Sequence, residues 1–95
     1  MAGKSRLRAR HLVNEDRELR FELIRLREAA GLKQKDVASR LGVSPQAVSK
    51  FERIDADPRL STIRRYAHAI GAIVSHKVEA DEGQLEDGED RRVWT

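Results

Sequence analysis

The sequence contains no cysteine, so the chain forms no disulfide and offers no thiolate ligand to a metal ion. It also has no apolar run long enough to span a bilayer, and residues 1–13 lack the apolar core of a signal peptide. These absences predict a protein of the reducing cytoplasm. A chain of 95 residues buries only a limited core, so we expect one small domain that gains stability from dimerisation.

The combinations of residues that catalysis and metal binding require are absent as well. No nucleophile stands in a pattern with a base, no glycine-rich loop is suited to phosphate, and His11, His68 and His76 are not at metal-ligand spacing. His68 is expected at the surface, and His76 at a contact with a partner subunit. The sequence therefore predicts no enzymatic activity, no cofactor and no metal site.

Charge is distributed unevenly along the chain. Residues 1–78 hold 17 Lys and Arg against 9 Asp and Glu, whereas residues 79–95 hold 2 against 7. A basic body favours a polyanionic partner. Residues 1–13 show no sustained helical stripe and are interpreted as a basic flexible arm of the kind that lies along DNA phosphates, or as a solubilising end. Residues 79–95 have the composition of an acidic disordered tail.

Apolar residues at helical spacing predict four helices. The first, over residues 15–30, follows a possible N-cap at Asn14 and ends at Gly31. The next two cover residues 33–41 and 45–53, separated by Gly42 and the capping pair Ser44-Pro45. Ser61 or Thr62 caps the last helix, which Gly71 ends. The expected inward positions are Leu19, Leu23, Leu26, Ala30, Val37, Ala38, Leu41, Val48, Phe51, Leu60, Ile63, Ala67 and Ile70.

Two further features predict a second copy of the chain. Phe21 and Ile24 form another apolar face on the first helix, which needs a partner. Residues 72–78 alternate in side-chain type, which favours a short β-strand, and a lone strand pairs most economically with its own copy across a two-fold axis. The predicted dimer interface consists of Phe21, Ile24, Ile73, Val74, His76 and Val78.

The run LREAAGLKQKDVASRLGVSPQAVSKFER and the helix LSTIRRYAHAIG resemble the XRE family, the Cro and lambda-repressor-like helix-turn-helix domains. The resemblance covers Leu19 to Gly71. It implies a mainly α fold, a four-helix lambda-repressor-like DNA-binding domain over residues 14–71, here followed by the short strand at 72–78. Residues 45–53 would be the recognition helix in the major groove.

The resemblance also assigns roles to single residues. Gln46 and Lys50 would contact base edges, with Ala47 and Ser49 close by; glutamine suits adenine, lysine suits guanine, and the alanine methyl suits thymine. The residues expected at backbone phosphates are Lys33, Gln34, Ser44 and Arg53. Arg27 and Glu52 match an ion pair that orients the recognition helix. Two positions depart from the family pattern: Ile54 stands where glycine is common, and Lys33 where a threonine-like cap is usual.

These features predict a transcriptional regulator, a repressor that binds an inverted-repeat operator in double-stranded DNA as a homodimer. Residues 60–81 also resemble XRE-type antitoxins, which bind their own promoter and hold a toxin; the acidic tail would suit a basic toxin surface, with Trp94 as an anchor. A third reading is an interaction adaptor that binds DNA without sequence preference. The operator and the regulated gene are not encoded in the sequence pattern.

Overall fold

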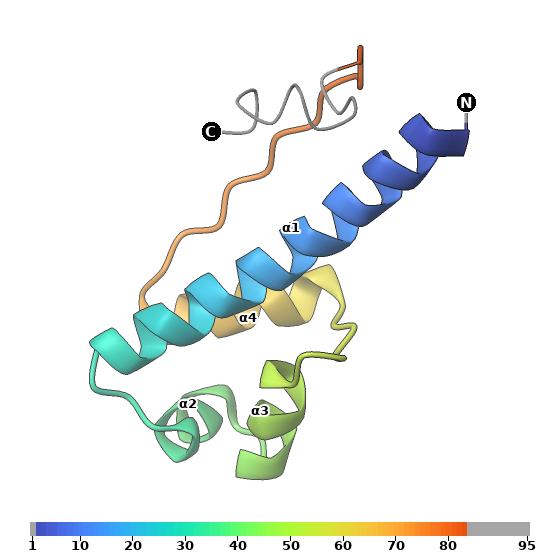
Figure 1. The fold of residues 1–95 in the computed structure, drawn as a ribbon. Coiled ribbons are helices and arrows are strands. Elements are labelled where there is room, and N and C mark those ends of the chain that lie inside the picture. Colours follow the sequence, from blue (N-terminus) through green and yellow to red (C-terminus); the bar gives the residue numbers. More distant parts are fainter. Residues whose placement is uncertain (1, 84–95) are drawn as a thin grey trace. The chain divides into compact units, whose positions relative to one another are not determined.

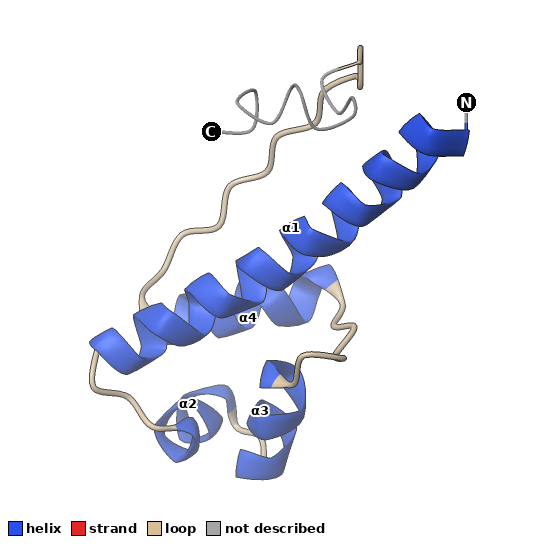
Figure 2. Ribbon diagram, in the orientation of Figure 1, coloured by secondary structure: helices blue, strands red, loops and turns tan. Residues whose placement is uncertain are grey.

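The computed structural model of the chain describes residues 2–83, and four helices lie within them (Figure 1). They are α1 (Ala2–Ala29), α2 (Gln34–Leu41), α3 (Pro45–Glu52) and α4 (Leu60–Ile70). Figure 2 shows that loops connect these helices and that no strand occurs in this part of the chain. The mainly helical fold class is therefore confirmed. None of the helices within residues 2–83 has both the length and the apolar character needed to cross a membrane.

The start of α1 differs from the prediction. The helix begins at Ala2, so Asn14 lies inside it and residues 2–13 are helical where an arm without helical structure was expected. The reason lies in propensity: this stretch is rich in alanine, leucine, lysine and arginine and contains no proline, and extending an existing helix costs far less than nucleating one. The absence of an apolar stripe therefore did not indicate that residues 2–13 are non-helical.

The chain divides into two compact units, residues 19–75 and residues 1–18 with 76–95. The core of the first unit contains Leu23, Val37, Ala38, Val48, Phe51, Tyr66, Ala67, Ala69 and Ile70. Leu19, Leu26, Leu41 and Ile63 pack against this core, as predicted. Leu60 and Ala30 were predicted inside but are exposed, Leu60 by 68%. Leu60 is the first residue of α4, which begins after Arg59 and not at a Ser61 or Thr62 cap, and the first turn extends beyond the core.

Helices α2 and α3 form the helix-turn-helix. Gly42 ends α2 in the left-handed conformation, with φ of 70°, which a residue with a Cβ adopts only at a cost. Its N–H and that of Val43 donate to the last carbonyls of α2, at Ser39 and Ala38. Ala38 is 1% exposed, and its small side chain permits close packing of the two helices. The sequence predicted both the glycine turn and the small residue.

Residues 72–78 do not form the predicted strand within a single chain. Gly71 ends α4, and the N–H of Ala72 donates back to the Ala67 carbonyl at 2.8 Å. Ala72 and Val74 then pack against the core of their own chain, whereas Ile73 is 92% exposed. A strand requires a neighbour for its backbone groups, and residues 2–83 of the chain offer none here. Residues 84–95 of the expected tail, with Trp94, lie outside the described residues.

Candidate nucleic-acid interface

The outer surface of α3 is defined by its cap and by its buried residues. Ser44 Oγ accepts a hydrogen bond from the Ala47 N–H at 3.1 Å, and Pro45 occupies the first helical position. Val48 and Phe51 are 2% and 7% exposed and fix the inward face. Apart from Glu52, the remaining positions of this two-turn helix face solvent.

All four side chains that were predicted to read bases, Gln46, Ala47, Ser49 and Lys50, are exposed on α3. Gln46, Ser49 and Lys50 stand at spacings of three and four residues, so they share one face of the helix. This face combines an amide that donates and accepts, a hydroxyl and an ammonium group. Such a combination can match the donors and acceptors that base pairs present in the major groove.

Two of the side chains expected at phosphates are exposed where the helices begin. Lys33 precedes α2, and its backbone N–H donates to the Asp36 carboxylate at 2.7 Å. The sequence interpretation missed this use of Asp36, whose carboxylate accepts from the backbone N–H of Lys33, while the Lys33 side chain accepts no cap hydrogen bond. Ser44 precedes α3 and already accepts from Ala47. Both residues therefore flank the amino-terminal ends of the two helices, where anionic groups are favoured.

Arg53 ends α3 and is held by Asp55. Its Nε and Nη2 donate to the two carboxylate oxygens of Asp55 at 3.1 and 3.0 Å, and both side chains are about two-thirds exposed. The hydrogen bond and the charge of Arg53 hold the pKa of Asp55 below its ordinary value. A guanidinium carries five N–H donors, so Arg53 keeps others for a phosphate while it is paired.

Gln34 lies differently from the expectation for a phosphate contact. It is half-buried, and its side-chain amide donates to Glu52 Oε1 at 2.9 Å. The structure thus brings Gln34 together with the predicted Arg27 and Glu52 pair. In this arrangement its side chain helps to fix the end of α3.

Arg27 and Glu52 form a doubly hydrogen-bonded ion pair between α1 and α3. Arg27 Nε donates to Glu52 Oε2 at 2.7 Å and Nη2 to Oε1 at 3.0 Å, while Nη1 donates to the Leu32 carbonyl at 2.7 Å. The two side chains are only 9% and 7% exposed. Because the pair is planar, bidentate and buried, it fixes the orientation of the last turn of α3 against α1.

Tyr66 completes this cluster, and the sequence interpretation missed it. Its hydroxyl donates to Glu52 Oε2 at 2.6 Å, and its ring stacks on Phe51 with centroids 4.4 Å apart. Burial raises the pKa of the Glu52 carboxyl, but the hydrogen bonds from Tyr66, Arg27 and Gln34 outweigh it and hold this pKa below its ordinary value. Burial and the Glu52 carboxylate both raise the pKa of Tyr66. The sequence did indicate that Tyr66 is buried, since it stands three residues after Ile63 and four before Ile70, on the inward face of α4.

Arg20 is a second buried cation that sequence reasoning did not find. It is 7% exposed, and its Nη2 donates to the Ala56 carbonyl at 3.2 Å, which ties α1 to the loop after α3. Its Nε and Nη1 are buried without a hydrogen-bond partner among the described residues. No local pattern marks Arg20, because its burial depends on a loop 36 residues later in the chain.

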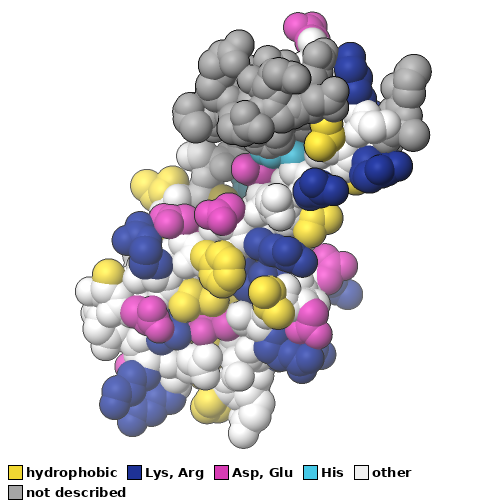
Figure 3. All heavy atoms as spheres, viewed as in Figure 1, with side chains coloured by type: hydrophobic (Ala, Val, Ile, Leu, Met, Phe, Trp, Pro, Cys, Tyr) yellow, Lys and Arg dark blue, Asp and Glu magenta, His cyan; other side chains and the backbone are white. Residues whose placement is uncertain are grey.

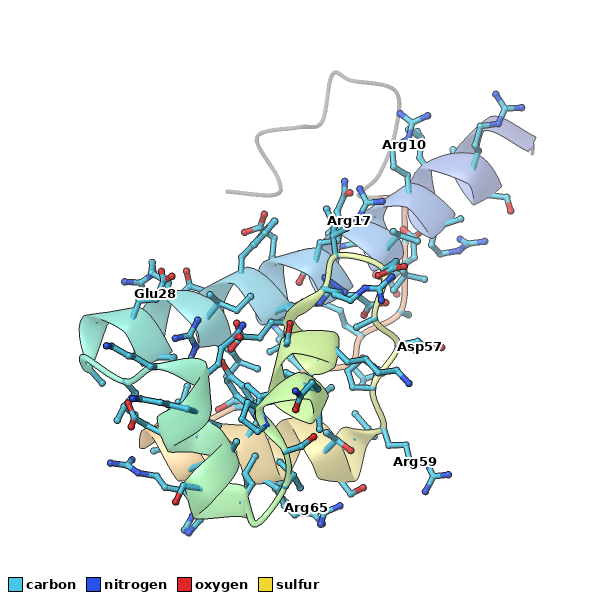
Figure 4. All side chains as sticks on the ribbon, turned by 90° about the horizontal axis from the view of Figure 1, so that it is seen from below. Arg10, Arg17, Glu28, Asp57, Arg59 and Arg65 are labelled. Atoms are coloured by element: carbon cyan, nitrogen blue, oxygen red, sulfur yellow. The ribbon has the colours of Figure 1, made fainter. Side chains whose placement is uncertain are left out.

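An open groove of about 470 Å³ adjoins the exposed face of α3. Lys50 and Arg53 line it from α3, and Asp55, Asp57 and Pro58 line it from the following loop. In Figure 4, Asp57 and Arg59 extend outward from this loop. The exposed face of α3 therefore ends in a depression that carries charges of both signs.

The chain is similar to one protein family and to two curated proteins. A family model described as Helix-turn-helix matches residues 23–73, more than half of the chain. Two curated proteins, both named Antitoxin HigA1 and from two strains of Mycobacterium tuberculosis, are 48% identical to it over 60 residues. These 60 residues are 63% of this chain but only 40% of each relative, so the match spans less than half of the relatives' length. No solved structure matches the chain.

Proposed function

The chain belongs to the helix-turn-helix family, and we propose that it is a sequence-specific regulator of transcription that represses by binding double-stranded DNA as a homodimer. The observation that carries this proposal is the exposed polar face of α3, held in place by the buried cluster around Glu52. Retention of a labelled operator duplex in the presence of excess unrelated DNA tests it. Loss of the complex at modest excess would contradict sequence-specific binding.

In this proposal α3 enters the major groove with Gln46 and Lys50 towards the base edges, and Ala47 and Ser49 beside them. Lys33, Ser44 and Arg53 surround the ends of the helices and contact phosphates, which position the helix without reading sequence. Gln34 acts mainly through Glu52, in keeping with the 2.9 Å hydrogen bond between them. Base contacts and phosphate contacts can then be distinguished by replacing one side chain at a time.

Replacing Arg53 with alanine should weaken binding similarly on operator and on random DNA. Each phosphate contact that is lost lowers the slope of log affinity against log salt by about 0.9. The measurement is a titration of both duplexes at several salt concentrations. Arg25, which pairs with Glu22 on α1, provides a matched arginine for the control variant Arg25→Ala, which should leave the slope unchanged. A loss confined to the operator would instead place Arg53 at a base.

The proposed homodimer uses the apolar side chains that the single chain leaves exposed. Phe21 is 50% exposed and Ile24 is half-buried on the same side of α1. Hydrophobic side chains gather over α1 near the centre of the face seen in Figure 3. Ile73 and Val78 are more than 90% exposed, and His76 is exposed between them. Pairing of residues 72–78 with a second copy would provide the backbone partners that a single chain lacks.

Replacing Phe21 with glutamate should disrupt this dimer, because association would bury an unpaired carboxylate. The expected result is a dimer dissociation constant at least roughly tenfold higher, since 1.4 kcal/mol corresponds to a factor of ten. Sedimentation in the absence of DNA measures it. Ile54→Glu places the same charge on an apolar side chain that is 62% exposed after α3, and should leave dimerisation intact. An equal effect of both variants would remove Phe21 from the interface.

The second candidate function is that of an antitoxin. It is supported by the 48% identity to two relatives named as antitoxins, although the match covers only 40% of their length. In this reading the C-terminal segment, with Ile73 and Val78 exposed and seven acidic residues after Val78, binds a basic toxin. Co-expression with the product of the adjacent gene distinguishes the two: a stable complex favours the antitoxin, and purification with its own copy alone favours the repressor.

A further inference from the structure

Residues 2–18 and 76–83, the described parts of the second unit, belong together, and the two segments of this unit carry opposite charge. Residues 1–13 contain four Lys and Arg and no carboxylate. Residues 79–95 contain seven carboxylates and two arginines. Within one unit the chain thus provides both a basic helix and an acidic segment.

A direct contact joins the two segments. Arg8 Nη1 donates to Asp81 Oδ2 at 3.0 Å, and the other carboxylate oxygen of Asp81 accepts from the Gly83 N–H at 3.1 Å. The Asp81 side chain is 20% exposed and that of Arg8 is 48% exposed. Both oxygens of Asp81 are therefore engaged, one with the helix and one with the acidic segment itself.

The face of α1 that carries Arg8 is partly covered. Leu7, Arg8 and His11 lie three, four and seven residues after Lys4, which places all four on one side of the helix. Leu7 and His11 are half-buried, whereas Arg6 and Arg10 are exposed. Figure 4 shows Arg10 and Arg17 projecting from this half of α1. The basic half of α1 thus has half-buried side chains on the face that carries Arg8, and exposed cations elsewhere.

We propose that the basic half of α1, residues 4–11, is a polyanion-binding surface, and that Asp81 of the acidic segment occupies it at Arg8 and competes with nucleic-acid phosphate. The identity of the competitor rests on the proposed DNA-binding function. Phosphates and carboxylates are recognised by the same guanidinium donors, so a phosphate that accepts from Arg8 Nη1 must displace Asp81 from it. The acidic segment then reduces the affinity of the protein for DNA of any sequence.

The effective concentration of a tethered segment allows a weak contact to compete with DNA. One exposed ion pair changes an equilibrium by no more than about fivefold, too little to hold a segment alone. A tethered segment, however, has an effective concentration on the order of millimolar. A tethered contact whose own dissociation constant is near this effective concentration halves the fraction of the surface that is free, and so weakens DNA binding about twofold.

Full-length variants test the proposal with a random-sequence duplex as the probe. Asp81→Asn keeps an acceptor for Gly83 but removes the charge facing Arg8, and should raise affinity for this duplex by about two- to fivefold, the equivalent of an exposed ion pair. Glu79→Gln is the matched control: it removes the same charge two residues earlier, where the carboxylate lies 4.0 Å from Lys77. Its affinity should change much less. In an Arg8→Gln background, Asp81→Asn should have no further effect.

Equal gains from Asp81→Asn and Glu79→Gln would overturn the proposal, because they would indicate net charge alone. A full Asp81→Asn gain in the Arg8→Gln background would overturn it as well. A readout without DNA separates this proposal from the proposed function: the side-chain Nε–H resonance of Arg8 should shift in Asp81→Asn and not in Glu79→Gln. An Arg8 shift with no operator preference would support the intramolecular contact and contradict only the sequence-specific function.

Discussion

Replacing Glu52 with alanine should lower the free energy of unfolding by about 3–5 kcal/mol, the usual cost of breaking a buried ion pair from one side. The variant leaves the Arg27 guanidinium, 9% exposed, without its carboxylate, and removes the acceptor of the Tyr66 hydroxyl and the Gln34 amide. For a domain of this size the melting temperature should fall by roughly 10 °C or more. DNA affinity should fall too, because the end of α3 loses its attachment to α1.

Glu22→Ala is the control for this experiment. Glu22 also accepts two hydrogen bonds from an arginine, Arg25, but that pair is exposed, so its loss should change melting little. Unchanged melting of Glu52→Ala would contradict the assignment of Glu52 as the residue that orients α3. Equal losses from the two variants would show that burial does not distinguish the two pairs.

The charge of Glu52 also predicts a dependence on pH. Its pKa is lowered in the folded protein, so its carboxylate stabilises the fold fully above the ordinary glutamate pKa of about 4.3. This contribution is lost as the pH falls through the lower folded-state pKa. Urea unfolding of the wild type and of Glu52→Gln should therefore differ at pH 7 and converge in strong acid. A constant difference across this range would show that the charge is not responsible.

Replacing Gln46 or Lys50 with alanine should cost about 1–3 kcal/mol each on the operator and relax the preference at the base pair concerned. These side chains are exposed on α3 and are not part of the core, so melting should stay the same. Affinity for random DNA should fall much less than affinity for the operator. Duplexes that differ at single base pairs measure the relaxed preference directly.

Arg25→Ala also serves as the control for Lys50→Ala, because it removes one exposed cation from another helix. Arg25 lies two residues after the buried Leu23 and therefore on the side of α1 that faces away from the core. Its effect on operator binding should be small. If Gln46→Ala and Lys50→Ala weakened operator and random DNA equally, these residues would not read bases, and the adaptor that binds DNA without sequence preference would account for the chain better.

Local signals were sufficient for most of the domain. The cap at Ser44 and Pro45, the left-handed turn at Gly42 and the spacing of Val48 and Phe51 each concern neighbouring residues, and each predicted the structure correctly. The pairing of Arg27 with Glu52, 25 residues apart, came from resemblance to the family and not from local rules. The sequence therefore predicted both α3 and the ion pair that attaches it to α1.

The features that sequence reasoning missed depend on distant parts of the chain. Arg20 is buried because the loop at Ala56 covers it, and the role of Tyr66 depends on where Glu52 lies. A polar or ionisable residue gives no sign in its own surroundings that such a partner exists. The start of α1 failed for another reason: an apolar stripe was required of residues 2–13, although helix propensity suffices for the extension of a helix.

The measurement that tests the central claim most directly is selection of bound duplexes from a random-sequence pool, followed by sequencing. The account predicts enrichment of an inverted repeat whose half-sites lie about one helical turn, roughly 34 Å, apart, because two copies of α3 related by a two-fold axis would enter successive major grooves. Gln46→Ala should then enrich the same spacing with one position relaxed. Recovery of duplexes with no common motif, or of a motif without two-fold symmetry, would contradict it.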